Sequence, residues 1–390
     1  MTPTPTPTLT SNPFYLSAKT RSDEITSAKS IFRESISFQK QLLSNDNNNY
    51  KRRILSSIKI NSYHSDHPSS PIFYNLRNLH PQEVAVLSSS NKCGCKVQDN
   101  NWSKVLLLID DPNYSHHVIY DRWLQEQCTH NYFAGDIVVI GITVRNCAVF
   151  DEESPPSSVS PALVPLGLHN NGIVSNSIFM PGCRVYSNSV VENSFFYGGS
   201  ILMNCGTVST EKSALLSSGA NHDAAKGFLK MTLGPEAGGG RDIEVCPEDT
   251  MIDVCMQLKL SPRRESNEFD SNEFMVLSRN AAPFNIFGKN SYAINTPKVL
   301  NVFMSSSSLI DAAASVQQII MLSGSSIING SVVEKAFLQW KAQISNGAHV
   351  NNSLLIECAA AETAAIVNSS VLGPDAHVGG GETQHTLLGK

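Results

Sequence analysis

Residues 332–350, VVEKAFLQWKAQISNGAHV, decide the fold of this chain. Counting in sixes from the first of them gives an apolar residue at every step, and the residue two positions before each later member is alanine. Side chains two apart on a strand point to the same face, so each short strand would direct one large and one small side chain inward. A narrow tube of stacked strands is filled in this way. The large residues are Val332, Leu338, Ile344 and Val350, and the small ones are Ala336, Ala342 and Ala348.

The count continues on both sides of this stretch. It runs back to Ile320 with one polar member, Ser326, and forward to Ile356. After a slip of four residues it resumes at Ile366, Leu372 and Val378. A separate ladder upstream contains Ile173, Phe179, Val185, Val191, Tyr197 and Met203.

Other regular structures do not fit this period. Residues six apart on an α-helix lie about 240° apart and cannot share a buried face. A single continuous strand would far exceed the usual limit of about ten residues, and Gly, Asn and Ser interrupt the stretch. Short strands joined by corners remain, and Asn193, Asn352 and Asn368 fall where corners need left-handed backbone angles. The sequence therefore predicts an all-β fold, an interrupted parallel β-helix that starts near Asp136.

The chain divides into three parts on composition and pattern. Residues 1–70, of which 32 are Ser, Thr, Asn or Pro, are expected to be a disordered tail. Residues 71–135 contain a helix-like segment from Leu79 to Leu87 and an apolar run from Val105 to Ile109, and predict a small mixed α/β cap. Residues 136–390 form the β-helix. Stretches 151–165, 210–230 and 261–298 break its period and are expected to be loop insertions.

Composition excludes several classes of function. The net charge of −5 offers no basic footprint for nucleic acid. No run of about 20 apolar residues and no secretory signal are present in the sequence, which predicts no membrane span and a cytoplasmic protein. The Ser-rich first 60 residues, with several Lys and Arg, leave an organelle transit peptide as the alternative.

The nine cysteines are irregularly spaced and are expected to be reduced thiols. Cys93-Gly94-Cys95 is a close pair, but no second pair follows it at zinc spacing. We therefore expect a turn there and no metal site.

The repeats resemble those of the hexapeptide-repeat, LpxA-like superfamily. The resemblance rests on the segments 347–353, GAHVNNS, and 373–378, GPDAHV. It implies a left-handed parallel β-helix, a homo-trimer, and an acyl donor such as acetyl-CoA in the members that are enzymes. It covers residues 320–378 well and residues 173–203 less closely.

Within that superfamily the chain looks like an uncharacterised domain of unknown function. The motifs are LRNL at 76–79 leading to Asp99 and Trp102, AGD at 134–136, and EAGGGR at 236–241. This narrower resemblance implies a link to sugar or sugar-nucleotide metabolism. It also implies further repeats and a segment rich in His and Gly after Lys390, so we expect that the chain is truncated at its C-terminus.

His349 and His377 are the candidate catalytic residues, because superfamily transferases use a coil histidine as general base and a neutral imidazole accepts a proton near pH 7. Both precede a ladder residue and should point outward. Outward histidines are usually just solvated, which is the alternative. Gly238, Gly239, Gly240 and Arg241 are the candidate ligand-binding residues, because backbone N–H groups and a guanidinium can hold a phosphate or carboxylate. A tight turn with a surface arginine is the alternative.

Two functions follow from these observations. The first is a non-catalytic scaffold for oligomerisation or binding, favoured because the sequence contains no cofactor motif. The alternative is a transferase that moves an acyl group to a sugar or sugar nucleotide, with His349 or His377 as base in a trimer cleft.

Overall fold

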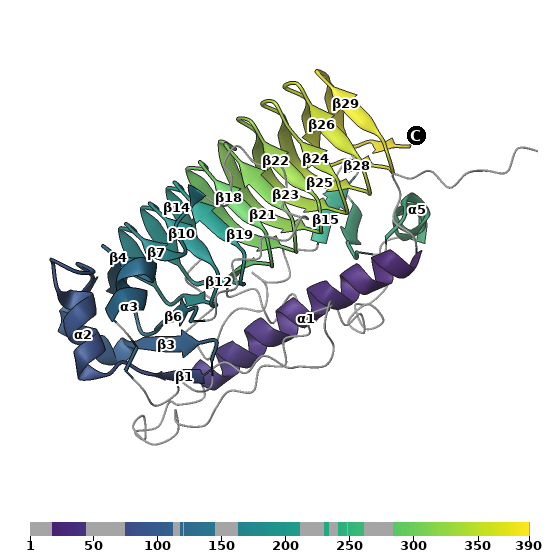
Figure 1. The fold of residues 1–390 in the computed structure, drawn as a ribbon. Helices are drawn as coiled ribbons and strands as arrows, with labels where there is room; N and C mark the ends of the chain where they lie inside the picture. Colours follow the sequence, from purple (N-terminus) through teal and green to yellow (C-terminus); the bar gives the residue numbers. More distant parts are fainter. Residues whose placement is uncertain are drawn as a thin grey trace, which may run out of the picture.

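The computed structural model describes residues 18–43, 75–111, 118–119, 121–144, 163–210, 230–233, 241–247, 249–260 and 284–389. Over these residues the chain is mostly β-structure and forms a parallel β-solenoid with few helices (Figure 1). Strands of successive coils pair in parallel at a spacing of seventeen residues, as Ser315 does with Val332, and Val332 with His349. The predicted β-helical fold is confirmed, and its handedness stays a prediction.

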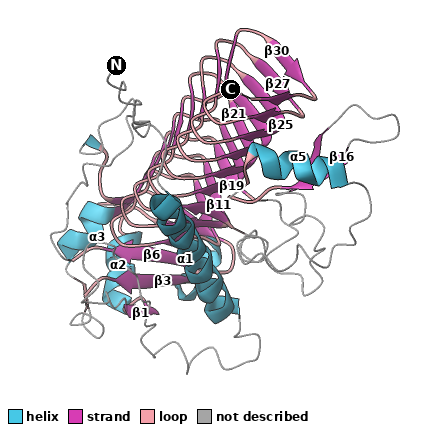
Figure 2. Cartoon of the chain, turned by 90° about the vertical axis from the view of Figure 1, so that its right-hand side faces the viewer, coloured by secondary structure: helices cyan, strands magenta, loops and turns pink. Residues whose placement is uncertain are grey.

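Three rows of strands run along the solenoid, one for each side of the coil (Figure 2). We call them the helix face, the open face and the third face. The helix face contains β3 (Val105–Ile109), β6 (Val138–Ile142), β9 (Ile178–Phe179), β12 (Ser194–Phe196), β17 (Asn285–Phe287), β28 (Val371–Leu372) and β31 (Leu387–Leu388). The open face contains β2 (Lys96–Val97), β5 (Tyr132–Ala134), β8 (Ile173–Ser175), β11 (Val190–Glu192), β14 (Thr207–Ser209), β27 (Ile366–Asn368) and β30 (Glu382–Gln384).

Four longer strands turn a corner, and contribute their first half to the open face and their second half to the helix face. They are β19 (Lys298–Met304), β21 (Ser315–Met321), β23 (Val332–Leu338) and β25 (His349–Leu355). The third face contains β4 (Cys128–Thr129), β7 (Gly167–His169), β10 (Arg184–Tyr186), β13 (Ile201–Met203), β18 (Tyr292–Ile294), β20 (Leu309–Asp311), β22 (Ser326–Ile328), β24 (Gln343–Ile344), β26 (Ala360–Glu362) and β29 (His377–Gly379).

The inward-pointing ladder advances by six, six and then five residues in each coil. The five-residue step crosses the corner between the open face and the helix face, for example from Val333 to Leu338. The members of this ladder after the long insertion are all buried in one continuous core. They are Phe287, Ala293, Val299, Met304, Ile310, Val316, Met321, Ile327, Val333, Leu338, Ile344, Val350, Leu355, Ala361, Val367, Leu372 and Val378.

A count in sixes therefore slips by one residue in every coil, because one corner is a residue short. The sequence prediction is right at Phe179, Val185, Val191, Leu338, Ile344, Val350, Leu372 and Val378. It is wrong at Ile173, Tyr197, Met203, Ile320, Ser326, Val332, Ile356 and Ile366, which lie next to inward residues and point outward.

The corners hold residues with left-handed backbone angles. Between the open face and the helix face these residues recur every seventeen positions, with φ between 46° and 54°: Asn176, Asn193, Asn301, Gln318, Lys335, Asn352 and Ser369. The corners predicted at Asn193 and Asn352 are confirmed. The corner predicted at Asn368 lies one residue later, at Ser369, because Asn368 is the last residue of β27.

The cap consists of β1 (Asn75–Asn78), α2 (Pro81–Ser88), two short 3₁₀ turns, η1 (Gln98–Asn100) and η2 (Trp102–Lys104), and α3 (Asp121–Gln127). Helix α2 confirms the helix predicted from Leu79 to Leu87. Strand β3 pairs antiparallel with β1 but parallel with β6, and β2 pairs parallel with β5. The solenoid therefore begins upstream of Asp136, and β2 and β3 of the predicted cap are part of it.

Two of the predicted insertions fall largely outside the described residues. The third insertion was predicted to extend to residue 298, which is too far, because β17 and β18 are strands of the solenoid. The long insertion after β14 contains a hairpin of β15 (Lys230–Leu233) and β16 (Arg241–Glu244), and helix α5 (Met251–Leu260). Met231, Ile243 and Val254 from this insertion pack in the same apolar cluster as the helix face.

A 26-residue helix, α1 (Ala18–Leu43), runs along the helix face (Figure 1). It lies inside the tail that composition predicted to be disordered, and residues 1–17 and 44–70 lie outside the described residues. The prediction therefore does not hold for α1. The reason is a stripe of apolar residues at helical spacing, Ile25, Ala28, Phe32 and Ile36, all buried against the solenoid.

Beneath α1 and the insertion lies an outward-pointing apolar ladder with one residue on each strand of the helix face from β3 to β28. Each member pairs with the next in strand register, and each is at most 4% exposed. In these strands the inward residue and the outward residue next to it are both apolar, as expected for strands buried on both sides. The members are Leu106, Val139, Ile178, Phe195, Ile286, Phe303, Ile320, Phe337, Leu354 and Val371.

The interior also holds polar and aromatic stacks. The Asn171 Nδ2 donates to Asn131 Oδ1 at 2.8 Å, and the Asn188 Nδ2 donates to Asn171 Oδ1 at 2.9 Å, so the buried amides form a hydrogen-bonded ladder. The rings of Phe179, Phe196 and Phe287 stack at centroid separations of 5.0 and 4.5 Å. In the part of the chain that the structure describes, no helix is long and apolar enough to cross a bilayer.

Candidate interaction surfaces

The open face presents a flat row of outward side chains from β8 to β30. Nearly every member of the row is followed in sequence by a valine that points into the core. Because adjacent residues of a strand point to opposite faces, the members of the row point away from the core. It mixes apolar and polar residues, and Ile173 and Ile366 are 38% and 44% exposed. Its members are Ile173, Val190, Thr207, Lys298, Ser315, Val332, His349, Ile366 and Glu382.

His349 lies in this row and His377 does not. His349 pairs with Val332 on one side and Ile366 on the other, and its side chain is exposed. His377 is exposed on the third face, where it pairs with Ala360, and its Nε2 lies 3.9 Å from Asp375 Oδ1. Both histidines point outward as predicted, but they belong to different faces. The structure therefore does not bring the two candidate bases together.

The predicted anion site is described only in part. Gly238, Gly239 and Gly240 lie outside the described residues, and Arg241 is the first residue of β16. The site stays a prediction. Among the described residues, no group of three His, Cys, Asp or Glu side chains is arranged to hold a metal ion.

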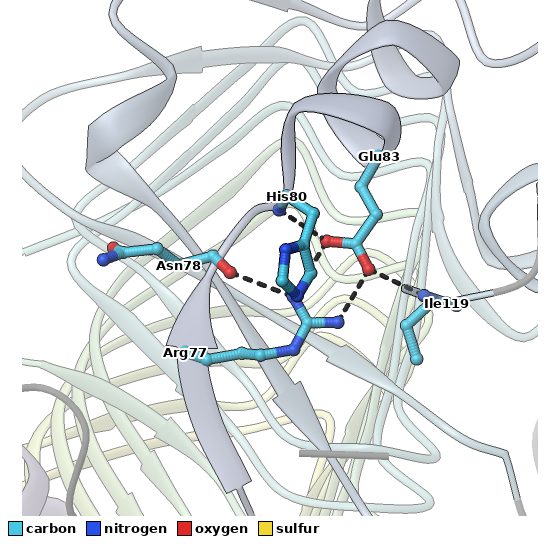
Figure 3. Close-up of polar contacts among 5 residues, drawn as sticks. All are labelled: Arg77, Asn78, His80, Glu83 and Ile119. Carbon is cyan, nitrogen blue, oxygen red and sulfur yellow. Dashed lines mark hydrogen bonds and ion pairs between the residues drawn. The ribbon is translucent and has the colours of Figure 1, made fainter. Parts of the chain in front are cut away.

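A buried ion pair, missed by the sequence reasoning, ties the cap together (Figure 3). Arg77 from β1 donates two hydrogen bonds to the carboxylate of Glu83 in α2, at 2.8 and 2.6 Å. The backbone N–H groups of His80 and Ile119 each donate to the same carboxylate at 2.8 Å. Burial alone would raise the pKa of Glu83, but these four donors and the guanidinium charge outweigh it and hold the pKa below its ordinary value.

The signal for this ion pair was Arg77 in the LRNL motif, six residues before Glu83 and beside an apolar strand. A carboxylate with four donors, two of them from a bidentate arginine, is saturated, because its oxygens have no further lone-pair directions to offer. Its role is therefore to hold β1, α2 and the chain near Ile119 in one arrangement.

Two thiols face each other at the first coil. The Sγ atoms of Cys95 and Cys128 lie 3.8 Å apart, and the Asn131 amide donates toward both. The hydrogen bond from Cys128 lowers the pKa of Cys95, while the same pairing and burial raise the pKa of Cys128. Gly94 has φ 63°, which confirms the turn predicted at Cys93-Gly94-Cys95. No pattern of residues indicated that Cys128 would join them.

Polar contacts fix α1 at three points along the helix face. Arg21 forms an ion pair with Glu357, whose side chain is 2% exposed, and Ser323 donates a hydrogen bond to Glu24. The Tyr197 hydroxyl donates to Glu34 at 2.7 Å. Burial raises the pKa of Glu34, although the hydrogen bonds from Tyr197 and Ser30 oppose that shift.

The spacing of these contacts matches the spacing of the coils. Glu24 and Glu34 are ten residues apart, a rise of about 15 Å in an α-helix. Tyr197 and Ser323 are three strand spacings apart, about 14 Å. One turn of α1 therefore sits over about one coil.

Comparison of this chain with family models, with curated proteins and with solved structures found no match.

Proposed function

We propose that this chain is a non-catalytic β-solenoid scaffold that associates with further copies of itself through the open face. The supporting observation is the difference between its faces. The helix face is covered by α1 and the insertion, whereas the row on the open face stays accessible, with Ile173 and Ile366 among its exposed apolar members. Flat repetitive surfaces are what solenoid proteins use for binding.

The proposal also includes the handedness, the superfamily and the oligomeric state of the solenoid. Three corners per coil with left-handed residues, and a small residue before many inward ones, support a left-handed, LpxA-like solenoid that forms a homo-trimer. The resemblance of the sequence also supports a role in sugar or sugar-nucleotide metabolism, with a sugar-linked ligand. The seventeen-residue coil departs from three strict hexapeptides at one corner.

Light scattering at micromolar concentration tests the association. The wild-type protein should be an oligomer, and the Val332→Glu/Ile366→Glu variant should be a monomer, because burial of a Val or Ile side chain contributes about 1.5–3 kcal/mol. Ile252→Glu is the control, since Ile252 is 73% exposed on α5, away from the open face. A monomeric wild-type protein would contradict the proposal.

The second candidate function is transfer of an acyl group from a donor such as acetyl-CoA. The observation that favours it is the exposure of His349 and His377, with Asp375 near the latter. A carboxylate beside an imidazole can orient it as a general base. His349→Ala or His377→Ala should then abolish transfer to amino sugars, and full activity in both variants would eliminate this function.

A further inference from the structure

The helix face is the docking surface of α1, and we call this surface the groove; apolar side chains and a few polar contacts hold the helix on it. Ile25, Ala28, Phe32 and Ile36 fill it, and the Phe32 ring stacks on Phe303 at 4.2 Å. These contacts depend on the sequence of α1 and not on which molecule carries it. A helix of the same pattern on another molecule would make the same contacts.

Helix α1 depends on this groove for its own structure. Ten of its 26 residues are Ser, Thr or Ile, which are weaker helix formers than Ala, Leu or Lys, and no acidic residue lies in its first turn. In proteins, most of the stability of a helix comes from packing of its amphipathic face rather than from its propensity. Folding of α1 is therefore coupled to docking, as for segments that order on binding.

The connection between α1 and the cap permits docking elsewhere. A stretch of 31 residues separates Leu43 from Asn75. Fully extended, a chain of that length reaches about 100 Å. That length is enough for α1 to reach a neighbouring copy, whereas attachment to the same chain favours its own solenoid through a higher effective concentration.

We propose that α1 is exchangeable, so that the α1 of one copy can occupy the helix face of a second copy. The groove then recognises an amphipathic helix with apolar residues at the spacing of α1, an arginine for Glu357, and hydrogen-bond acceptors for Ser323 and Tyr197. Exchange of identical elements between copies needs no new contacts. This proposal concerns a different face from the proposed function, so either can fail alone.

Complementation between two full-length variants tests the exchange. Phe32→Asp damages α1 and leaves the groove intact, whereas Phe303→Asp damages the groove and leaves α1 intact. Both variants also carry Val332→Glu and Ile366→Glu, so that association through the open face does not interfere. Native mass spectrometry of the mixture should show a 1:1 complex that neither variant forms alone. A mixture of the two folded variants that stays monomeric overturns the proposal.

A labelled peptide of residues 18–43 provides a second measurement that does not need the Phe303→Asp chain to fold. It should bind the Phe32→Asp protein about tenfold or more tightly than the wild type, where the tethered helix competes. Ser27→Asp is the matched control, because Ser27 is exposed on α1, and it should behave as wild type. Equal peptide binding to the wild type and to Phe32→Asp also overturns the proposal.

Discussion

Substitution of Glu83 by Gln should destabilise the cap strongly at neutral pH. Glu83 accepts four hydrogen bonds and is fully buried against Arg77. Gln keeps the shape but presents an amide NH₂ to donors and leaves the guanidinium without its counter-charge. Breaking a buried ion pair by removing one partner costs about 3–5 kcal/mol, which sets the expected loss in the free energy of unfolding of the cap.

The pH dependence follows from the direction of the pKa shift. The pKa of Glu83 is lower in the folded protein than its ordinary value. Its charge therefore contributes stability above the ordinary pKa, and this contribution is lost as the pH falls through the folded pKa. The difference between wild type and Glu83→Gln should shrink between about pH 7 and about pH 3, a range that brackets the ordinary Glu pKa of about 4.3.

Urea denaturation followed by tryptophan fluorescence measures this difference. Trp102 and Trp123 both pack against the core at the cap, so a Trp340→Phe background makes the signal report on that region. Glu126→Gln in α3 is the control, because its ion pair with Arg122 is exposed and should contribute nothing measurable. Equal midpoints for the two variants, or a deficit that persists unchanged in acid, would refute the reasoning.

Two further predictions concern the core and α1. Phe196→Ala should lower the free energy of unfolding by about 3–5 kcal/mol, because it empties a site between two stacked rings. Urea denaturation measures this loss, with Tyr132→Ala as the control because Tyr132 is 38% exposed. An equal loss of stability in the two variants would contradict the prediction. Glu34→Gln should increase hydrogen-exchange protection of α1 at neutral pH. Because the pKa of Glu34 is raised in the folded protein, the stability of the wild type falls as the pH rises past the ordinary Glu pKa. The wild type and Glu34→Gln should therefore have similar protection in acid. Lower protection of α1 in Glu34→Gln than in the wild type at neutral pH would contradict this prediction.

The period of the core could be predicted from sequence because large and small residues alternate inside every strand. The phase could not, since the short corner moves the inward position by one residue per coil. The sequence does contain a signal for the covered side of the coil, namely adjacent apolar pairs such as Phe195-Phe196 and Ile286-Phe287. Such pairs mark strands buried on both faces, and they therefore indicate the side of the coil that α1 and the insertion cover.

The error over α1 has a different cause. Composition describes an average over the segment, whereas docking depends on a few positions, and the spacing of Ile25, Ala28, Phe32 and Ile36 was visible among the serines. For the candidate site, sequence indicated that His349 and His377 point outward. It could not indicate that they lie on different faces, because that depends on the number of corners between them.

A repeat of fixed length links the size of the solenoid to the length of α1. Deletion of residues 315–331 would remove one whole coil and bring Val332 into the place of Ser315, with every later side chain still in phase. The molecule would shorten by about 4.8 Å. Helix α1 would not shorten with it, so it could keep the contact of Arg21 with Glu357 or that of Glu34 with Tyr197, but not both. The number of coils and the length of this helix can therefore change only together.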